Sequence, residues 1–373
     1  MKNLIYLCLL FINCIFISCS QKIEDSNKPL KCLDLEKNIG FVNSKKLIPD
    51  DLKIIQLESC DSDFDLNKSR ILDITGDTVF LLNNDFIPTK ILMFSLQSGK
   101  YLGEINHQGE GMGEYRFLFG AFIDSKTQSV LIPDVDRPFV YDYSLLSDSL
   151  IHTYERPELT LRLQPIGNVN NGINLGEPKE EGLNILQCNA KFEVTDSLLL
   201  KEVQIIPFTT LWAQSGTHGI IFKNDTLSII GKEHLTPVVR LNLGKYKLKV
   251  KEAKEIYEGM IYSDEPDSEY LKRLTNYIIV KDFQFTDDNI LVTSIYGETN
   301  YSDLYNIHTG EILNRFESEK DFNGSGRLTM ENNEGKILIV EKLFTKDNVW
   351  FGVSDSQGLS ESTNEISIIK FRM

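Results

Sequence analysis

The stretch MFSLQSGKYLGEI at residues 93–105 decides the fold, because it recurs without a gap as LYNIHTGEILNRF at residues 304–316. The alignment places Gly99 on Gly310, and each copy predicts two short strands joined by a Ser/Thr-Gly turn. Glycine supplies the positive φ angle that such a turn needs. A third copy, PFVYDYSLLSDSLIHTY at residues 138–154, has Ser-Asp in place of the glycine turn. The chain is therefore expected to consist of repeated hairpins.

A second kind of hairpin, an apolar run, an acidic turn and another apolar run, precedes each of these copies. It reads ILDITGDTVFLLN from Ile71, AFIDSKTQSVLIPD from Ala121 and DFQFTDDNILVTSI from Asp282. Two hairpins make a four-stranded unit, and a period of about 50 residues with four antiparallel strands is typical of a β-propeller. We expect an all-β, six-bladed β-propeller, with seven blades or another β fold as alternatives. The expected blades are residues 69–106, 118–155, 187–213, 218–250, 279–317 and 328–371.

Two further segments fit this architecture. Closure of the ring needs both ends of the chain, so residues 52–58 (LKIIQLE) and 366–371 (ISIIKF) are expected to share one sheet. Residues 263–277 break the strand pattern, and their apolar and aromatic positions predict a short amphipathic helix between blades.

The N-terminus predicts export and a lipid anchor. Lys2 precedes an apolar segment at residues 4–17, which is shorter than the roughly 20 residues that span a membrane. The sequence FISC at residues 16–19 resembles a bacterial lipobox with Phe16 where Leu is usual, so Cys19 is the predicted acylation site. A simple secretory signal or an uncleaved anchor is the alternative. We expect a lipoprotein signal peptide (residues 1–18), a flexible polar tether (19–48) and the propeller (49–373), anchored to the outer membrane in the cell envelope and facing either the periplasm or the cell surface.

Composition limits the partners and cofactors. The formal net charge of −15 becomes −16 once Lys2 leaves with the signal, and an acidic surface repels nucleic acid. Beyond the signal and Cys19, three cysteines remain, of which Cys32 and Cys60 are candidates for a disulfide and Cys188 for a buried position. No CxxC motif or Cys/His cluster occurs, so no metal site is assigned.

The segment NHQGEGMGEYRF at residues 106–117, between FSLQSGKYLGEI and FIDSKTQSVLIPDVDRPFVYDY, resembles a family. It is similar to the six-bladed β-propeller lipoproteins of gut Gram-negative anaerobes, relatives of NHL-repeat and TolB-like propellers. The usual junction of that family reads Gly-x-Gly-Pro-Gly-Glu-Tyr. Met112 replaces the Pro here, and the positions that fit are Gly109, Gly111, Gly113, Glu114 and Tyr115. The resemblance implies a structural junction between blades and a lipid anchor, while most members have no assigned activity.

Five residues around this junction are candidate ligand-binding residues. His107 and Glu110 lie in the glycine-rich loop, and Asp134, Asp136 and Arg137 follow the end of an expected strand. In NHL-like blades an acid at this place bonds its own turn. In the alternative, such acids from several blades converge on a central channel and bind a polar ligand or a divalent cation such as calcium.

These observations favour a binding module over an enzyme. No HExxH, GxSxG or SxxK motif occurs, so no catalytic residue is assigned. We expect a lipid-anchored propeller that binds an envelope protein, a peptide or a glycan. The alternatives are a lactonase-like hydrolase or lyase with a divalent cation in the channel, and a structural subunit of an envelope complex.

Overall fold

In the computed structural model β-strands are the main regular structure of the residues that are described. The structure describes residues 30–41, 47–59, 69–83, 89–118, 120–134, 136–155, 164–166, 173–179, 182–201, 203, 212–215, 218–231, 233–262, 267–319, 326–355 and 366–373. The predicted anchor at Cys19, Cys60 and the first part of the tether lie outside these residues. Within the described part, Lys31–Met373 forms one structural unit.

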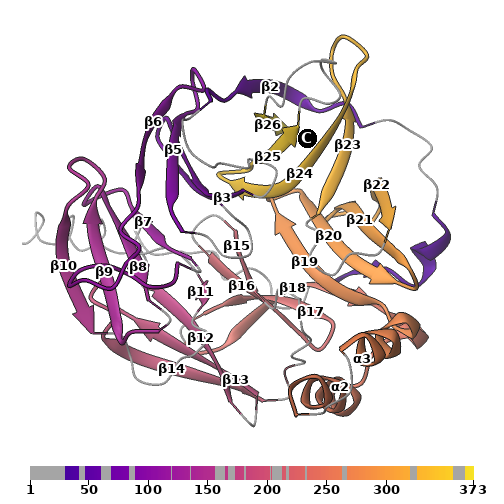
Figure 1. The fold of residues 1–373 in the computed structure, drawn as a ribbon. Helices are drawn as coiled ribbons and strands as arrows, with labels where there is room; N and C mark the ends of the chain where they lie inside the picture. Colours follow the sequence, from indigo (N-terminus) through magenta and orange to yellow (C-terminus); the bar gives the residue numbers. More distant parts are fainter. Residues whose placement is uncertain are drawn as a thin grey trace, which may run out of the picture. The chain divides into compact units, whose positions relative to one another are not determined.

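The strands form six sheets in a propeller-like arrangement (Figure 1). The first three sheets each take four consecutive antiparallel strands. The first contains β3 (Arg70–Thr75), β4 (Thr78–Leu82), β5 (Ile91–Ser95) and β6 (Tyr101–Ile105). The second contains β7 (Phe122–Asp124), β8 (Ser129–Pro133), β9 (Phe139–Ser144) and β10 (Leu150–Glu155). The third contains β11 (Gln164–Ile166), β12 (Ile173–Lys179), β13 (Gly182–Cys188) and β14 (Val194–Lys201).

The other three sheets include two that gain a fifth strand from the N-terminal segment. The fourth contains β15 (Trp212–Ser215), β16 (His218–Lys223), β17 (Thr226–Ile230), β18 (Leu235–Asn242) and β1 (Lys31–Asp34). The fifth contains β19 (Ile279–Phe285), β20 (Asn289–Tyr296), β21 (Thr299–Asn306) and β22 (Ile312–Glu319). The sixth contains β23 (Arg327–Glu331), β24 (Ile337–Lys346), β25 (Val349–Asp355), β26 (Ile366–Arg372) and β2 (Asp50–Gln56).

One strand of each sheet faces the centre of this arrangement. Strand β15 lies against both β11 and β19, β3 lies against β7, and β24 lies against β3, β15 and β19. In the sixth sheet β24, and not the terminal strand β23, therefore takes the inner position. Strand β23 lies instead against β22 of the fifth sheet.

The repeated hairpins are confirmed, and their turns share one backbone geometry. Gly99 and Gly310 have φ angles of 74° and 76°, and Asp148 takes the same place in the third copy with a φ of 49°. In each turn this residue donates its backbone N–H to the carbonyl four residues earlier, at 2.8, 2.8 and 3.0 Å. Aspartate tolerates the left-handed region better than most residues, which explains how Ser-Asp replaces the glycine turn.

A side-chain oxygen at the start of each turn completes the geometry. The oxygens belong to Ser95, Ser144 and Asn306, and each accepts the backbone N–H groups two and three residues further along the chain. Short polar side chains favour turns for this reason. The turn signal in the sequence is thus a pair of residues, the polar acceptor and the glycine or aspartate after it.

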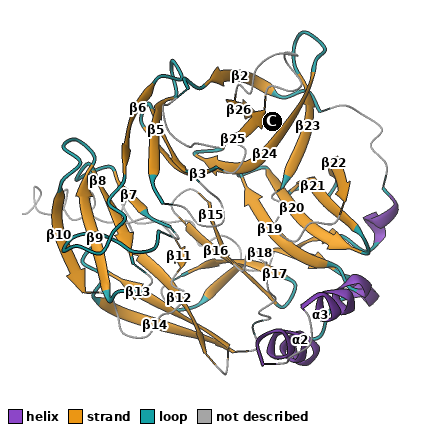
Figure 2. Ribbon diagram, in the orientation of Figure 1, coloured by secondary structure: helices purple, strands orange, loops and turns teal. Residues whose placement is uncertain are grey.

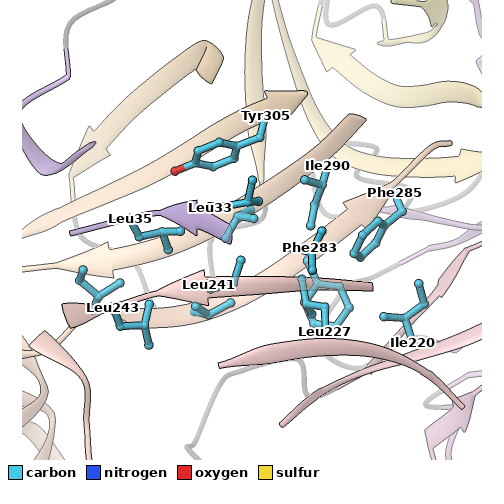
Figure 3. Packing of buried hydrophobic residues seen from close by; sticks show 14 residues of the cluster. Leu33, Leu35, Ile220, Leu227, Leu241, Leu243, Phe283, Phe285, Ile290 and Tyr305 are labelled. Atoms are coloured by element: carbon cyan, nitrogen blue, oxygen red, sulfur yellow. The ribbon is translucent and has the colours of Figure 1, made fainter. Parts of the chain in front are cut away.

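The predicted tether is wrong for residues 31–41, which pack onto the sheets. Strand β1 pairs with β18, and this pairing is parallel, whereas only antiparallel strands were expected. Leu33 and Leu35 are 0% and 3% exposed and lie in a core cluster with Leu241 of the fourth sheet, Leu243 directly after it and Tyr305 of the fifth sheet (Figure 3). Burial of two leucines contributes roughly 3–6 kcal/mol, which makes this segment part of the fold.

A buried ion pair holds the residues that follow β1. Arg315 on β22 binds both carboxylate oxygens of Asp303 on β21, at 2.5 and 2.7 Å, and both side chains are almost fully buried. Arg315 also donates to the carbonyl oxygen of Asn38, within the 3₁₀ turn η1 (Lys37–Gly40), at 2.6 Å and to that of Phe41, directly after the turn, at 3.4 Å. Burial raises the pKa of the Asp303 carboxyl, and the hydrogen bond and charge of Arg315 oppose that rise.

The predicted closure of the sixth sheet is confirmed. Strand β2 pairs antiparallel with β26, with Ile54 opposite Ile369 and Ile55 opposite Ile368. The end of β2 also meets the first repeated hairpin, since the Glu58 N–H donates to the Gly99 carbonyl at 2.9 Å.

Two of the predicted unit boundaries are wrong. In place of the blade expected at residues 187–213, the structure has a sheet that runs from β11 to β14. The blade expected at residues 218–250 begins earlier, with β15, and ends earlier, with β18. Strand β12 carries Gly176 and Pro178, residues that are depleted in strands, so the sequence did not predict this strand. The remaining four units agree with the sheets to within four residues at either end.

Helices interrupt the strands between the fourth and fifth sheets (Figure 2). The predicted helix is confirmed as α3 (Asp267–Arg273), which continues into the 3₁₀ turn η4 (Leu274–Asn276). A second helix, α2 (Val250–Tyr262), was not predicted, and it follows the 3₁₀ turn η3 (Gly244–Tyr246). Its buried Ala253 and Ile256 pack with Leu248, Leu274 and Ile279.

Replacement of Gly99 by Ala should destabilise the protein more than the same change at Gly310. Both residues have φ angles that cost an L-residue about 1–2 kcal/mol. A Cβ at Gly99 would also lie 1.8 Å from the Gln56 carbonyl oxygen, whereas a Cβ at Gly310 would meet the Cys32 oxygen at 3.3 Å. In urea unfolding followed by tryptophan fluorescence we expect losses of about 3 kcal/mol for Gly99→Ala and about 1–2 kcal/mol for Gly310→Ala. Equal losses would contradict the contact of this turn with β2.

Candidate functional site

The loop of residues 106–117 is anchored by Tyr115, which is fully buried between the first and second sheets. Its backbone N–H donates to the His107 carbonyl and its carbonyl accepts the Gly109 N–H, both at 3.0 Å. Its phenol donates to the Thr89 carbonyl at 2.8 Å. Burial raises the pKa of Tyr115, which keeps the phenol a hydrogen-bond donor. Tyr115 thus packs at the junction of two sheets, as the resemblance implies.

The glycines of the motif make room for Glu114 and its neighbours. The Glu114 carboxylate accepts the Gly111 N–H at 2.6 Å. A Cβ at Gly109 would lie 2.1 Å from the same carboxylate oxygen, and Gly113 has a φ of 80° with Leu150 at 2.8 Å from its would-be Cβ. Side chains at these positions would push the loop apart.

Arg137 holds the backbone of the loop, and Arg116 adds exposed ion pairs. Arg137 donates to the carbonyl oxygens of Glu110, Gly111 and Glu114, at 3.0, 3.0 and 2.8 Å. Arg116 binds the Glu110 carboxylate at 2.6 Å and the Asp136 carboxylate at 2.5 Å. Hydrogen bonds to both carboxylates raise the pKa of Arg116. A charged clamp therefore holds the loop in one shape.

Asp134 bonds the backbone of its own turn, which is the structural role expected for an acid at this place in NHL-like blades. Its side chain is fully buried, and its two oxygens accept the N–H groups of Arg116 at 2.8 Å and of Asp136 at 3.0 Å. Its backbone N–H donates to the Phe139 carbonyl. These bonds orient the carboxylate toward backbone amides and lock the strand end to the loop.

His107 lies on the other side of the loop, away from Glu110. Its ring stacks on Tyr143 with a centroid distance of 4.4 Å and an interplanar angle of 6°. Its Nε2 lies 2.8 Å from the Asp148 carboxylate in the hairpin turn of the second sheet. The five predicted site residues thus surround one loop, where Glu110, Asp136 and Arg137 share a network with Arg116, and His107 belongs to a separate contact.

Four exposed aliphatic side chains belong to this loop and to the hairpin of β9 and β10 in the second sheet. Met112 projects fully into solvent at the tip, and Leu150 on β10 touches the neighbouring Gly113 position. Leu146 is 82% exposed in the turn that carries Asp148, and Ile151 is 53% exposed on β10. We call Met112, Leu146, Leu150 and Ile151 the aliphatic patch. Sequence reasoning missed both this patch and Arg116, although Arg116 directly follows the motif.

The inner strands carry a second polar group that sequence reasoning also missed. Strands β3 and β19 each contain a bulge just before an aspartate, and that aspartate accepts the next backbone N–H: Asp73 from Ile74 at 2.7 Å and Asp282 from Phe283 at 2.8 Å. Asp73 also pairs with Lys346 on β24 at 2.7 Å. The matching segments ILDI and VKDF carried a signal for this repeat in the sequence.

Burial raises the pKa of Asp282 to about 6, although the Phe283 amide and the charge of Lys281 lower it. Among the described residues no group of three or more His, Cys, Asp and Glu side chains is placed to hold a metal ion.

Of the two cysteines that the structure describes, Cys32 is exposed and Cys188 is buried. Burial raises the pKa of the Cys188 thiol to about 11.

Comparison with known proteins gives a family and a fold. The family profile described as a domain of unknown function, DUF4934, matches residues 31–365. The chain belongs to this family. Among functionally curated proteins, none matches the chain. The match begins at β1, which agrees with β1 being part of the folded domain.

One similar solved structure supports the same fold. A putative exported protein from Bacteroides fragilis is 15% identical, with a TM-score of 0.61 over 87% of this chain and 95% of that one. A DUF4221 member from Bacteroides vulgatus is 11% identical, with a TM-score of 0.44 over 88% and 98% of the two chains. No helix in the described part of the chain has the length and apolar character to span a membrane.

Replacement of Arg137 by Ala should loosen the loop. Three carbonyl oxygens lose a charged donor, so we expect amide hydrogen exchange in residues 109–116 to accelerate by roughly tenfold or more. Arg116→Ala is the matched control, because its ion pairs are exposed and contribute little. Equal acceleration in both variants, or none in Arg137→Ala, would contradict the clamp.

Replacement of Asp282 by Asn should stabilise the protein at neutral pH. A raised pKa means that the folded protein binds a proton between about pH 4 and pH 6 that the unfolded chain lacks, so the stability of the natural protein falls as pH rises through this range. The amide keeps an acceptor for the Phe283 N–H. Urea unfolding should show Asp282→Asn more stable by about 1–2 kcal/mol at pH 7, with the difference vanishing near pH 4. A difference that does not change with pH would be the contrary result.

Proposed function

We propose that this chain is a lipid-anchored, six-bladed β-propeller of the cell envelope that binds a protein or peptide through the aliphatic patch. The observation that carries the binding site is the combination of a clamped loop with an exposed Met112. Because the backbone of the loop is already fixed, little backbone conformational freedom is lost when a partner binds, which favours affinity.

Six blades follow from reading each sheet as one blade. With β24 as its inner strand, the last blade consists of β24, β25, β26 and β2, so β2 supplies the outer strand. Strands β1 and β23 are then additions to this scheme. The lipid anchor rests on Cys19 and the apolar segment before it.

The character of the patch favours a protein or peptide over a glycan. Its side chains are aliphatic, whereas glycans are bound by planar rings and many polar groups. The rim carries Glu110, Asp136 and Asp148, whose side chains are 76%, 42% and 51% exposed. Such a rim suits a partner with basic residues around an apolar centre.

The binding site is tested with peptide and glycan arrays. Peptides that combine apolar and basic residues should bind the mature protein, and Met112→Glu or Leu150→Glu should lower their affinity by roughly tenfold or more. Leu313→Glu is the matched control, since Leu313 is an exposed leucine on β22 in the fifth sheet.

Two results would overturn the proposal. One is a protein that binds glycans and no peptides. The other is a Leu313→Glu variant that loses as much peptide binding as the variants in the patch.

A further inference from the structure

A concentration of basic residues lies at the end of the fourth sheet, in a chain that is strongly acidic overall. Between Arg240 and Lys251 the chain contains five basic residues and no acidic one. All of these side chains are exposed, as is that of Lys254 one turn further along α2. We call this set the basic surface: Arg240, Lys245, Lys247, Lys249, Lys251 and Lys254.

Acidic neighbours reduce the charge of only part of the basic surface. Lys247 pairs with Asp225 at 2.5 Å, and Lys251 and Lys254 lie 3.9 and 3.6 Å from Glu255 and Glu258 on α2. The pairs on α2 are solvent-exposed and therefore weak. Lys245 lies over the ring of Tyr246, at 4.9 Å from its centroid.

The N-terminal segment meets the fold at the same place. Cys32 pairs with Arg240 in the parallel β1–β18 register, and the Glu36 N–H donates to the Asn242 carbonyl. Lys31 and Lys37 are exposed in this segment, and Asp34 and Glu36 balance their charge, so the positive charge comes from residues 240–254. The Glu36 carboxylate accepts the Lys245 backbone N–H at 3.4 Å. The chain that leads back toward Cys19 therefore leaves the propeller beside the basic surface.

Few residues separate Cys19 from the folded part, because that part begins with β1 at Lys31. The 12 peptide steps between these two residues reach at most about 40 Å. An acylated Cys19 would thus hold the basic surface close to the membrane. The short separation from Cys19 and the positive charge of the basic surface both favour the membrane as its partner.

We propose that the basic surface docks onto anionic phospholipid headgroups of the membrane that carries the anchor. This proposal uses the lipid anchor of the proposed function for proximity, and the basic surface itself for recognition. Basic side chains near an anionic membrane each strengthen binding by roughly fivefold, and salt screens the effect. In Figure 1 the second sheet lies at the left and helix α2 at the lower right, so the two proposed surfaces belong to different parts of the ring.

The test measures co-sedimentation of the mature chain without Cys19, residues 20–373, with lipid vesicles. We expect binding to vesicles of phosphatidylcholine with phosphatidylglycerol at low salt, and loss of that binding at high salt or with phosphatidylcholine alone. The triple variant Lys245→Glu, Lys249→Glu and Lys251→Glu should weaken binding by roughly tenfold or more. The matched control reverses three exposed lysines elsewhere, Lys100, Lys126 and Lys191, with the same change in net charge.

Three outcomes would overturn this proposal: no binding to anionic vesicles, equal binding to neutral ones, or an equal loss in the control variant. None of them bears on the anchor, because the vesicle assay omits Cys19. Acylation is read separately from the mass of the full protein and of its Cys19→Ala variant. A failure of the anchor and a failure of the basic surface are therefore distinguishable.

Discussion

The attachment of the N-terminal segment to three successive sheets is the constraint on which the rest of the structure depends. Strand β1 pairs with the fourth sheet, Arg315 of the fifth sheet binds the carbonyl groups after it, and β2 completes the sixth sheet. Sheets arranged around a centre leave a seam where the two ends of the chain meet, and a single ladder closes it in the simplest case. Here the N-terminal segment is held by two strands, β1 and β2, and by the buried Asp303–Arg315 pair, which binds the residues between them.

The same attachment sets the functional arrangement. Since β1 is part of the fold, the predicted tether of residues 19–48 ends earlier than expected, and only 12 peptide bonds separate Lys31 at the start of β1 from Cys19. On the second sheet, Tyr115, Glu114 and Arg137 hold a glycine-rich loop rigid and leave Met112 in solvent. The two proposed surfaces thus belong to different sheets, the fourth and the second.

The sequence predicted the features that local chemistry controls. Turn glycines and alternating apolar runs gave the hairpins, the closing strands and helix α3, because short-range rules decide them. It did not predict β1, where two buried leucines stand among polar residues and depend on distant sheets for burial. The loop residues were grouped correctly because they are close in sequence. The Asp73–Lys346 pair was missed because 273 positions separate its members. Arg116 was missed because one of its partners, Asp136, lies 20 residues away in the turn after β8.

Amide hydrogen exchange of the mature protein at residues 31–56 tests the central claim most directly. If the N-terminal segment is part of the ring, the amides of β1 and β2 that pair with β18 and β26 exchange only through large-scale opening, with protection similar to that of β20 and β21. Exchange of residues 31–41 at the rate of an unstructured peptide would contradict the account.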